Sequence, residues 1–142
     1  MTKGYAMSIE DMEKDVQLMK EYNCNAVRTS HYPPDPVFLT MCDFYGLYTV
    51  DEADIETHGF YAIPYSTYNP NRLSNDITWA SHYLDRVKRM YGRDKNHPCI
   101  TMWSLGNESG GYKCQDECYN YLKKVNPQIP VCLLYTSPSP RD

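Results

Sequence analysis

The sequence has 142 residues, of which 42% are hydrophobic and 23% charged, and these proportions are those of a soluble globular protein with one core. Its formal net charge is -4, so the basic surface of a nucleic-acid-binding protein is not expected. No run approaches the roughly 18 to 20 apolar residues that cross a bilayer, and the first residues lack the apolar core of a signal peptide. We therefore predict neither nucleic acid nor a membrane as a partner.

The first predicted helix begins after Ser8, which forms a capping-box pattern with Asp11. Apolar residues then recur at helical spacing and predict a buried stripe of Ile9, Met12, Val16 and Met19. Residues 26–29 have the character of a short buried strand, which the segment at 30–34 ends because a residue before proline avoids helical conformations.

The second helix is predicted from Asp35 as its cap and Pro36 at its first position, with Gly46 ending it in a left-handed conformation. Residues 47–50 form a second predicted strand, and an acidic segment follows at 51–59. From there to Asn75 the chain is rich in Tyr, Pro and Asn without any period, which is typical of a functional loop.

The third helix is predicted to begin at Asn75 or Asp76 and to be closed by Gly92 and then Asn-His-Pro at 96–98. Its predicted buried stripe is Ile77, Ala80, Leu84, Val87 and Met90. An apolar strand from Cys99 then delivers Glu108 to its carboxyl end. A fourth helix places Cys118, Tyr121, Leu122 and Val125 on one face, and residues 131–134 form a fourth predicted strand.

Helices and strands alternate along the chain, which predicts an α/β fold with a parallel sheet. The carboxyl ends of parallel strands meet at one edge of the sheet, so the ionisable groups after each strand are expected to lie close together in one site. The six cysteines lack paired CxxC spacing and are interpreted as reduced core thiols; Cys114 and Cys118 would hold a metal only with further ligands. Residues 135–142 have the composition of a disordered or non-native Ser/Pro tail.

Three motifs stand in order: Arg-Thr-Ser-His-Tyr-Pro at 28–33, Asp-Glu-Ala-Asp-Ile-Glu-Thr-His-Gly at 51–59 and Trp-Ser-Leu-Gly-Asn-Glu-Ser at 103–109. Together with residues 93–98 they resemble the catalytic barrel of glycoside hydrolase family 2, in particular the large bacterial β-galactosidases. The resemblance covers about residues 5 to 131. It implies a (β/α)₈ barrel, of which residues 1–134 would form about half. Asp54 departs from the Asn found in the family.

The resemblance also implies a retaining two-carboxylate mechanism and assigns the site residues. Glu108 would be the catalytic acid and later the base, while Asn107, His31 and Arg28 would form the substrate-binding set. For Arg28 we favour holding a carboxylate such as Glu108, because guanidinium is a bidentate partner for carboxylates. The metal ligands would be Glu56, His58 and Glu108, holding Mg²⁺, with Mn²⁺ also suitable. The nucleophile, a second Glu, would lie beyond Asp142, so the chain alone is expected to be inactive.

Several alternatives remain open. The first and third motifs are shared with β-glucuronidases and β-mannosidases, whereas Glu-Thr-His-Gly favours a β-galactosidase acting on a lactose-like substrate. A non-catalytic, sugar-binding half-barrel is the alternative outside the enzyme class. Tyr61, Tyr65 and Tyr68 are candidates for an aglycone subsite, although chance placement is favoured among 14 tyrosines. The parent protein is expected to be a homo-oligomer; its compartment stays open, with the cytoplasm favoured.

Overall fold

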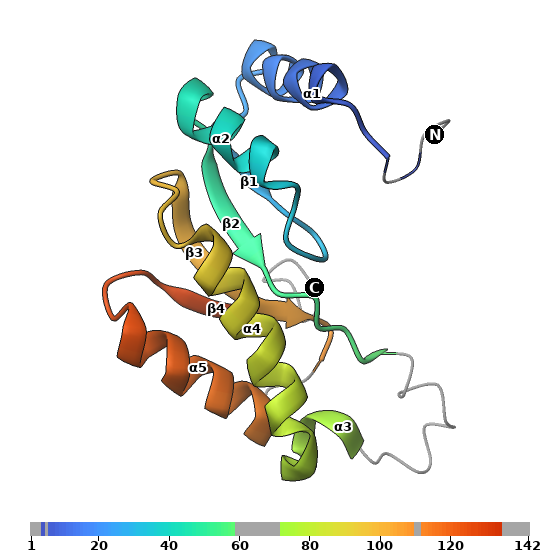
Figure 1. Ribbon diagram of the computed structural model, residues 1–142, viewed down its shortest axis with the longest axis vertical. Helices are drawn as coiled ribbons and strands as arrows, with labels where there is room; N and C mark the ends of the chain where they lie inside the picture. Colours follow the sequence, from blue (N-terminus) through green and yellow to red (C-terminus); the bar gives the residue numbers. More distant parts are fainter. Residues whose placement is uncertain (1–3, 5, 59–71, 110–111, 135–142) are drawn as a thin grey trace, which may run out of the picture.

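The structure is a computed structural model, and it describes residues 4, 6–58, 72–109 and 112–134. Helices and strands follow one another in the predicted alternation (Figure 1). The elements are α1 (Ile9–Glu21), β1 (Ala26–Arg28), α2 (Pro36–Tyr45), β2 (Tyr48–Glu52), α3 (Arg72–Asn75), the 3₁₀ helix η3 (Ile77–Trp79), α4 (Ala80–Asp94), β3 (Ile100–Asn107), α5 (Lys113–Val125) and β4 (Val131–Leu134).

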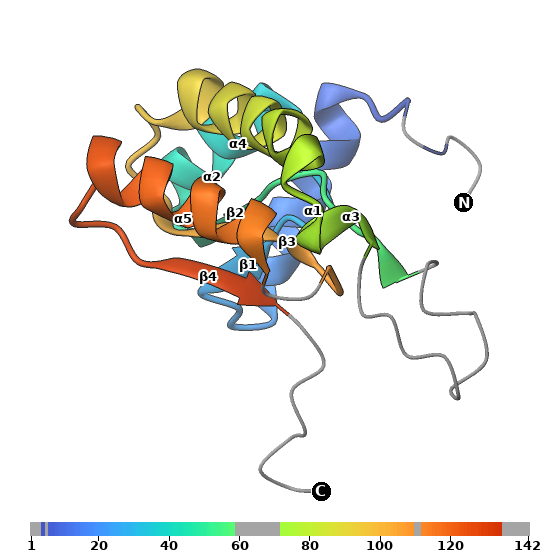
Figure 2. The same ribbon diagram turned by 90° about the horizontal axis from the view of Figure 1, so that it is seen from below.

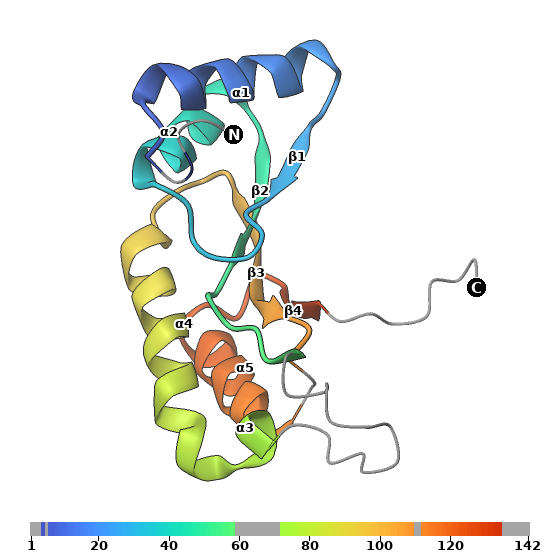
Figure 3. The ribbon, with the colours of Figure 1, turned by 90° about the vertical axis from the view of Figure 1, so that its right-hand side faces the viewer.

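The four strands form one parallel sheet in the order β1-β2-β3-β4. In its register Glu52 of β2 lies opposite Ser104 of β3, which in turn lies opposite Cys132 of β4. Helices α2, α4 and α5 lie on the same side of this sheet (Figures 2 and 3). The predicted parallel α/β fold is therefore confirmed, and all four carboxyl ends open at one edge of the sheet.

The hydrophobic core fills the space between the sheet and these helices. Trp103 of β3 is 1% exposed and packs edge-to-face on Tyr91 of α4, with 5.5 Å between the ring centroids. Fully burying one Val, Leu or Met side chain, as in the rest of this core, stabilises a fold by about 1.5 to 3 kcal/mol. The surrounding core includes Val16, Leu39, Leu47, Val87, Met90, Cys118 and Leu122.

The predicted ends of the first two helices are confirmed. The Ser8 hydroxyl accepts from the Asp11 amide at 3.2 Å, and the Asp11 carboxylate accepts from the Ser8 amide at 3.0 Å, which completes a capping box. The Asp35 carboxylate caps α2 by accepting from the Val37 amide at 2.8 Å, and Gly46 ends that helix with a φ of 70°. These signals act within a few residues, so the sequence alone contains them.

The predicted third helix is wrong in its first turns. Asp76 caps η3 instead, because its carboxylate accepts from the Thr78 amide at 3.0 Å and closes a tight 3₁₀ turn before α4 begins. Ile77 is consequently 53% exposed, and Tyr83 lies in the buried row of α4. The helix ends at Asp94, between Gly92 and the segment at 96–98 that were predicted to close it.

Two other predicted stripes are wrong at their outermost residues. Ile9 is 56% exposed in the first turn of α1, and Val125 is 39% exposed in the last turn of α5. None of the helices that the structure describes has both the length and the apolar character needed to cross a membrane.

All six cysteines are free thiols, but only four of them belong to the core. Cys24 is exposed and Cys132 is partly exposed, so the prediction of six core thiols is wrong for these two. Burial raises the pKa of Cys118 to about 12, and that of the Cys99 thiol to about 12 as well. Thiols of this kind stay protonated and inert at neutral pH.

Candidate active site

The carboxyl-terminal ends of the four strands lie at one edge of the sheet, which we call the carboxyl edge. At its centre is the side chain of Glu52, which is fully buried at the end of β2. It accepts hydrogen bonds from Arg28 Nε at 2.8 Å, Arg28 Nη2 at 2.9 Å, Ser104 Oγ at 2.7 Å and His31 Nδ1 at 3.1 Å. Burial alone would raise the pKa of Glu52, but the hydrogen bonds from Arg28, Ser104 and His31 outweigh it and lower that pKa below its ordinary value. Glu52 is therefore a fixed buried anion.

Arg28 links this anion to the next strand. Its Nη2 donates to Asn107 Oδ1 at 2.9 Å, and Asn107 Nδ2 donates to Glu56 Oε1 at 2.8 Å. The prediction that Arg28 holds a carboxylate is confirmed, but that carboxylate is Glu52 and not Glu108, because Arg28 lies within the sheet beside Glu52, whereas Glu108 lies beyond the end of β3. Sequence reasoning noted the Asp51-Glu52 pair as an acidic strand end but did not assign Glu52 a role; its position at the end of a strand was the available signal.

The loop after β2 approaches the end of β3 at Gly106. This glycine has a φ of 117°, and a Cβ there would overlap the Ile55 carbonyl oxygen and lie 2.8 Å from the Ile55 Cβ. The missing side chain lets the Asn107 amide donate to the Ile55 carbonyl at 2.9 Å, and Glu56 pairs with Asn107 in a parallel bridge. Glu56, in the loop after β2, and Asn107, the last residue of β3, thus become neighbours.

Glu108 follows directly in a left-handed backbone conformation, with a φ of 41°. Such a conformation is uncommon for a residue other than glycine and is frequent at functional sites. The next residue, Ser109, is fully buried and its hydroxyl donates to the Asn107 carbonyl at 2.7 Å. The chain therefore turns sharply at Glu108, between a paired strand end and a buried anchor.

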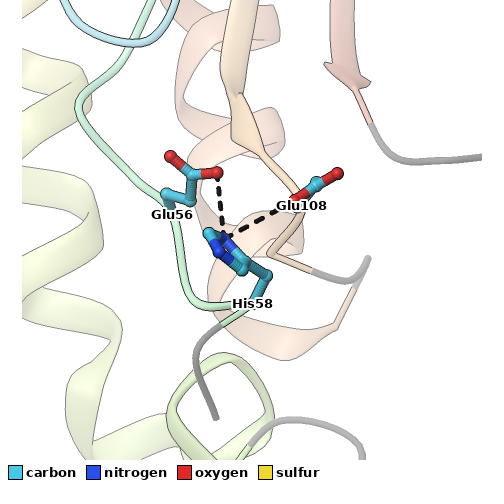
Figure 4. Close-up of side chains that lie close together, drawn as sticks. All are labelled: Glu56, His58 and Glu108. Atoms are coloured by element: carbon cyan, nitrogen blue, oxygen red, sulfur yellow. Dashed lines mark ion pairs between the residues drawn. The ribbon is translucent and has the colours of Figure 1, made fainter. Parts of the chain in front are cut away.

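Glu56, His58 and Glu108 converge in one cluster (Figure 4). His58 Nδ1 lies 3.0 Å from Glu56 Oε1 and 3.5 Å from Glu108 Oε2, and one ligand atom from each residue lies within 4.8 Å of the others. The three side chains are 58%, 31% and 35% exposed for His58, Glu56 and Glu108, so water reaches all of them. Two carboxylates, one imidazole and free access for water are a donor set that fits Mg²⁺ or Mn²⁺.

The structure brings all six predicted site residues into one connected set. Hydrogen bonds or ion pairs link His31 and Arg28 through Glu52 and Asn107 to the cluster described above. The six side chains therefore lie together at one edge of the sheet, as expected, whereas the role of each residue stays a prediction. The candidate subsite at Tyr61, Tyr65 and Tyr68 lies outside the described residues.

A parallel sheet with charged and amide side chains gathered at the carboxyl ends of its strands is the arrangement of α/β catalytic domains. Within that class, the model of the glycosyl hydrolases family 2 TIM barrel domain matches residues 1–137, and the chain belongs to this family. The predicted fold, a partial (β/α)₈ barrel, is thereby confirmed.

Curated relatives and solved structures agree with this assignment. The chain is 51% identical over 128 residues to a β-galactosidase of Pectobacterium atrosepticum, which covers 90% of this chain and 12% of that protein. It is 50% identical over 129 residues to a β-galactosidase of Psychromonas ingrahamii, with 91% and 12% covered. It thus spans about 12% of the length of these relatives.

Among solved structures, a β-glucuronidase of an uncultured Clostridium species matches with a TM-score of 0.74 and 25% identity, covering 92% of this chain and 23% of that one. A β-glycosidase from Bacteroides vulgatus matches with a TM-score of 0.69 and 26% identity, covering 90% and 16%. The fold of the described residues is therefore that of glycosidase barrels of this family.

Proposed function

We propose that this chain supplies the acid/base part of a retaining β-galactosidase, which releases terminal non-reducing β-D-galactose from β-galactosides. The observation that carries the proposal is the position of Glu108, next to Asn107 and 3.5 Å from His58, at the carboxyl edge of a family 2 barrel sheet. The curated relatives share about half of their aligned residues with this chain and are named β-galactosidases, which supports galactose as the sugar.

Glu108 would first donate a proton to the leaving glycosidic oxygen and would later accept a proton from the attacking water. A retaining enzyme also needs a nucleophilic carboxylate about 5 to 5.5 Å from the acid. In the proposal this second Glu lies on a later strand, outside the 142 residues. We therefore expect no turnover from the chain on its own, and hydrolysis of a chromogenic β-galactoside by the pure chain would contradict this.

Asn107 would bind a sugar hydroxyl, and its hydrogen bonds fix which of its atoms is available. One Nδ2 hydrogen goes to Glu56, and Oδ1 accepts from Arg28, so the second Nδ2 hydrogen remains for substrate. His31 is 44% exposed and uses Nδ1 toward Glu52, which leaves Nε2 for another sugar hydroxyl. Arg28 would act by orienting Glu52 and Asn107 rather than by touching sugar.

Glu56, His58 and Glu108 would hold Mg²⁺ or Mn²⁺. When bound, such a cation would add fixed positive charge beside the acid and hold its carboxylate in one orientation. The three ligand side chains are 31% to 58% exposed, so water can reach a cation bound there. This fits Mg²⁺, because it usually keeps several waters.

Two alternatives remain. A β-glucuronidase is favoured by the solved structures of that name, and β-mannosidase activity belongs with it as another sugar specificity within the family. A non-catalytic half-barrel that binds sugar weakly is the alternative outside enzymes. Homo-oligomeric assembly of the parent protein and a cytoplasmic location also stay predictions.

The test is a graft. The 128 matched residues would replace their counterparts in the Pectobacterium enzyme, and the purified graft would be given lactose, a nitrophenyl β-galactoside, a β-glucuronide and a β-mannoside. We expect hydrolysis of the galactosides and its loss in the E108A graft. A folded graft that prefers the glucuronide or mannoside would favour that specificity, and one that only binds galactose would favour the non-catalytic alternative.

A further inference from the structure

A cluster of buried polar side chains lies beneath the two loops that carry the candidate cation ligands. We call it the hydroxyl cluster, and its members are Thr57, Ser74, Tyr83, Ser109 and Gln115. None of them is more than 8% exposed, and Ser74 and Ser109 are fully buried. They come from both loops and from α3, α4 and α5; α3 packs beside the first turn of α5 (Figure 3).

Ser74 is the centre of this cluster. Its hydroxyl donates to the Ser109 carbonyl, which also accepts from Gln115 Nε2 at 3.3 Å. A serine hydroxyl has a single hydrogen, so Tyr83, whose hydroxyl lies 3.0 Å away, must be the donor in its bond with Ser74. Burial raises the pKa of Tyr83, which keeps that hydrogen in place. The Thr57 hydroxyl also lies 3.4 Å from the Ser74 hydroxyl oxygen.

These bonds act on the residues next to the candidate ligands. Ser109 directly follows Glu108, and Thr57 stands between Glu56 and His58. One hydroxyl therefore contacts the two loops whose side chains must converge within a few ångströms. The Ser74 hydroxyl, by donating to the Ser109 carbonyl, holds the backbone directly after the left-handed residue Glu108.

We propose that Ser74 is a positioning residue that sets the distance between the Glu108 carboxylate and the Glu56–His58 pair. It touches neither substrate nor cation and acts through Ser109 and Thr57. The inference rests on the proposed function in both its parts: the catalytic part on the role of Glu108 as the acid, and the affinity part on the proposed cation site. Loss of a group that hydrogen-bonds a metal ligand typically weakens metal affinity or activity by about 10- to 100-fold. Ser74 bonds to the residues beside the candidate ligands, so we expect the lower end of that range.

The experiment uses the graft in the complete Pectobacterium enzyme, with Mn²⁺ as the probe and electron paramagnetic resonance of free Mn²⁺ as the readout. An E56Q graft, which lacks the negative charge of one ligand, gives the background from other sites. We expect S74A to weaken Mn²⁺ binding about 10-fold or more and to lower kcat more than it raises KM, and we expect S74T, which keeps a hydroxyl, to restore both.

The matched control is T49V. Thr49 is also fully buried, and its hydroxyl bonds to the Leu47 carbonyl at 3.4 Å, but it lies near the opposite end of β2 from the cluster. T49V should lower the melting temperature as S74A does while leaving Mn²⁺ affinity unchanged. Equal Mn²⁺ affinities for S74A, T49V and the unmodified graft would overturn the proposal.

Y83F covers the case in which S74A does not fold, because it removes one donor to Ser74 and keeps the serine. A folded Y83F graft should bind Mn²⁺ several-fold more weakly, and unchanged affinity would overturn the proposal. It would equally be overturned if the unmodified graft bound no more Mn²⁺ than E56Q. Failure of the unmodified graft to hydrolyse galactosides, with Mn²⁺ binding intact, would instead count against the proposed function alone.

Discussion

Arg28 and Glu52 form a two-point ion pair across β1 and β2, with distances of 2.8 and 2.9 Å from Nε and Nη2 to the two carboxylate oxygens. The Glu52 side chain is fully buried, and the Arg28 side chain is one-third exposed. Arg28 Nη2 also reaches Asn107 on the third strand, at 2.9 Å. A single planar donor group therefore fixes the orientation of side chains from two other strands, which makes the pair the structural base of the site.

Removing the carboxylate should destabilise the fold. In E52Q the guanidinium loses its ionic partner, and we expect a loss of about 3 kcal/mol in the free energy of unfolding, at the low end for a buried pair because Arg28 is partly exposed. Urea denaturation followed by tryptophan fluorescence, to which the buried Trp103 contributes, measures it. The control R89A breaks an exposed pair with Asp85 and should cost below about 1 kcal/mol. Similar losses in both variants would contradict the assignment.

The stability of the fold should fall with rising pH because of Asp51. This carboxyl is fully buried, and burial together with the neighbouring Asp94 raises its pKa from 3.8 to about 8. A raised folded-state pKa means that the folded protein binds the proton more tightly than the unfolded chain does. The stabilisation is therefore complete below about pH 4 and is lost progressively as pH rises toward 8.

The variant D51N keeps the shape of this side chain and cannot titrate. Its urea midpoint should fall less between pH 5 and pH 8.5 than that of the unmodified chain. The control D85N changes an exposed acid and should keep the original pH dependence. Identical pH profiles for D51N and the unmodified chain would show that Asp51 titrates normally.

Two glycine variants should change stability in opposite directions. In G106A the new Cβ meets the Ile55 carbonyl in a backbone conformation with φ of 117°, so we expect a loss of about 2 kcal/mol or more. G92A adds a methyl group in open space within α4 and should gain roughly 0.5 to 1 kcal/mol. Chemical denaturation compares them directly. A neutral G106A would mean that the loop after β2 does not approach β3 this closely.

Divalent cations should stabilise the protein through the cluster of Glu56, His58 and Glu108. A cation at 100 times its dissociation constant adds about 2.7 kcal/mol to the free energy of unfolding. We expect Mg²⁺ to raise the melting temperature and EDTA to reverse the rise, and we expect E56Q and H58A to abolish the effect. E117Q, which changes an exposed acid on α5, should respond as the unmodified protein does. If Mg²⁺ raised the melting temperature of H58A as much as that of the unmodified protein, the assignment of these three residues as cation ligands would be contradicted.

The features that could be predicted from the sequence are those whose causes lie within a few residues or in the alternation of elements. Ser8, Asp35 and Gly46 mark helix ends by local hydrogen bonds or backbone preference, and they were predicted correctly. Asp76 shows the limit of such reasoning, because its bond to Thr78 favours a 3₁₀ turn over the first turn of a long helix.

The features that escaped prediction depend on strand register and on packing between distant elements. The contact of Arg28 with Glu52 depends on the register of β1 against β2, which no local pattern states. The contact of Ser74 with Ser109 likewise requires α3 to pack under a loop 35 residues further along the chain. The site residues themselves were found through family motifs, but their distances depend on the close approach at Gly106.

The most direct test of the central claim, that Glu108 is the proton donor, compares leaving groups in the graft. A poor leaving group such as the glucose of lactose needs a proton, whereas dinitrophenolate leaves without one. In E108A, kcat/KM should fall by about 100-fold or more on lactose, within the range of general-acid contributions, and far less on dinitrophenyl β-galactoside at the glycosylation step. Equal losses on both substrates would contradict the assignment of Glu108 as the acid.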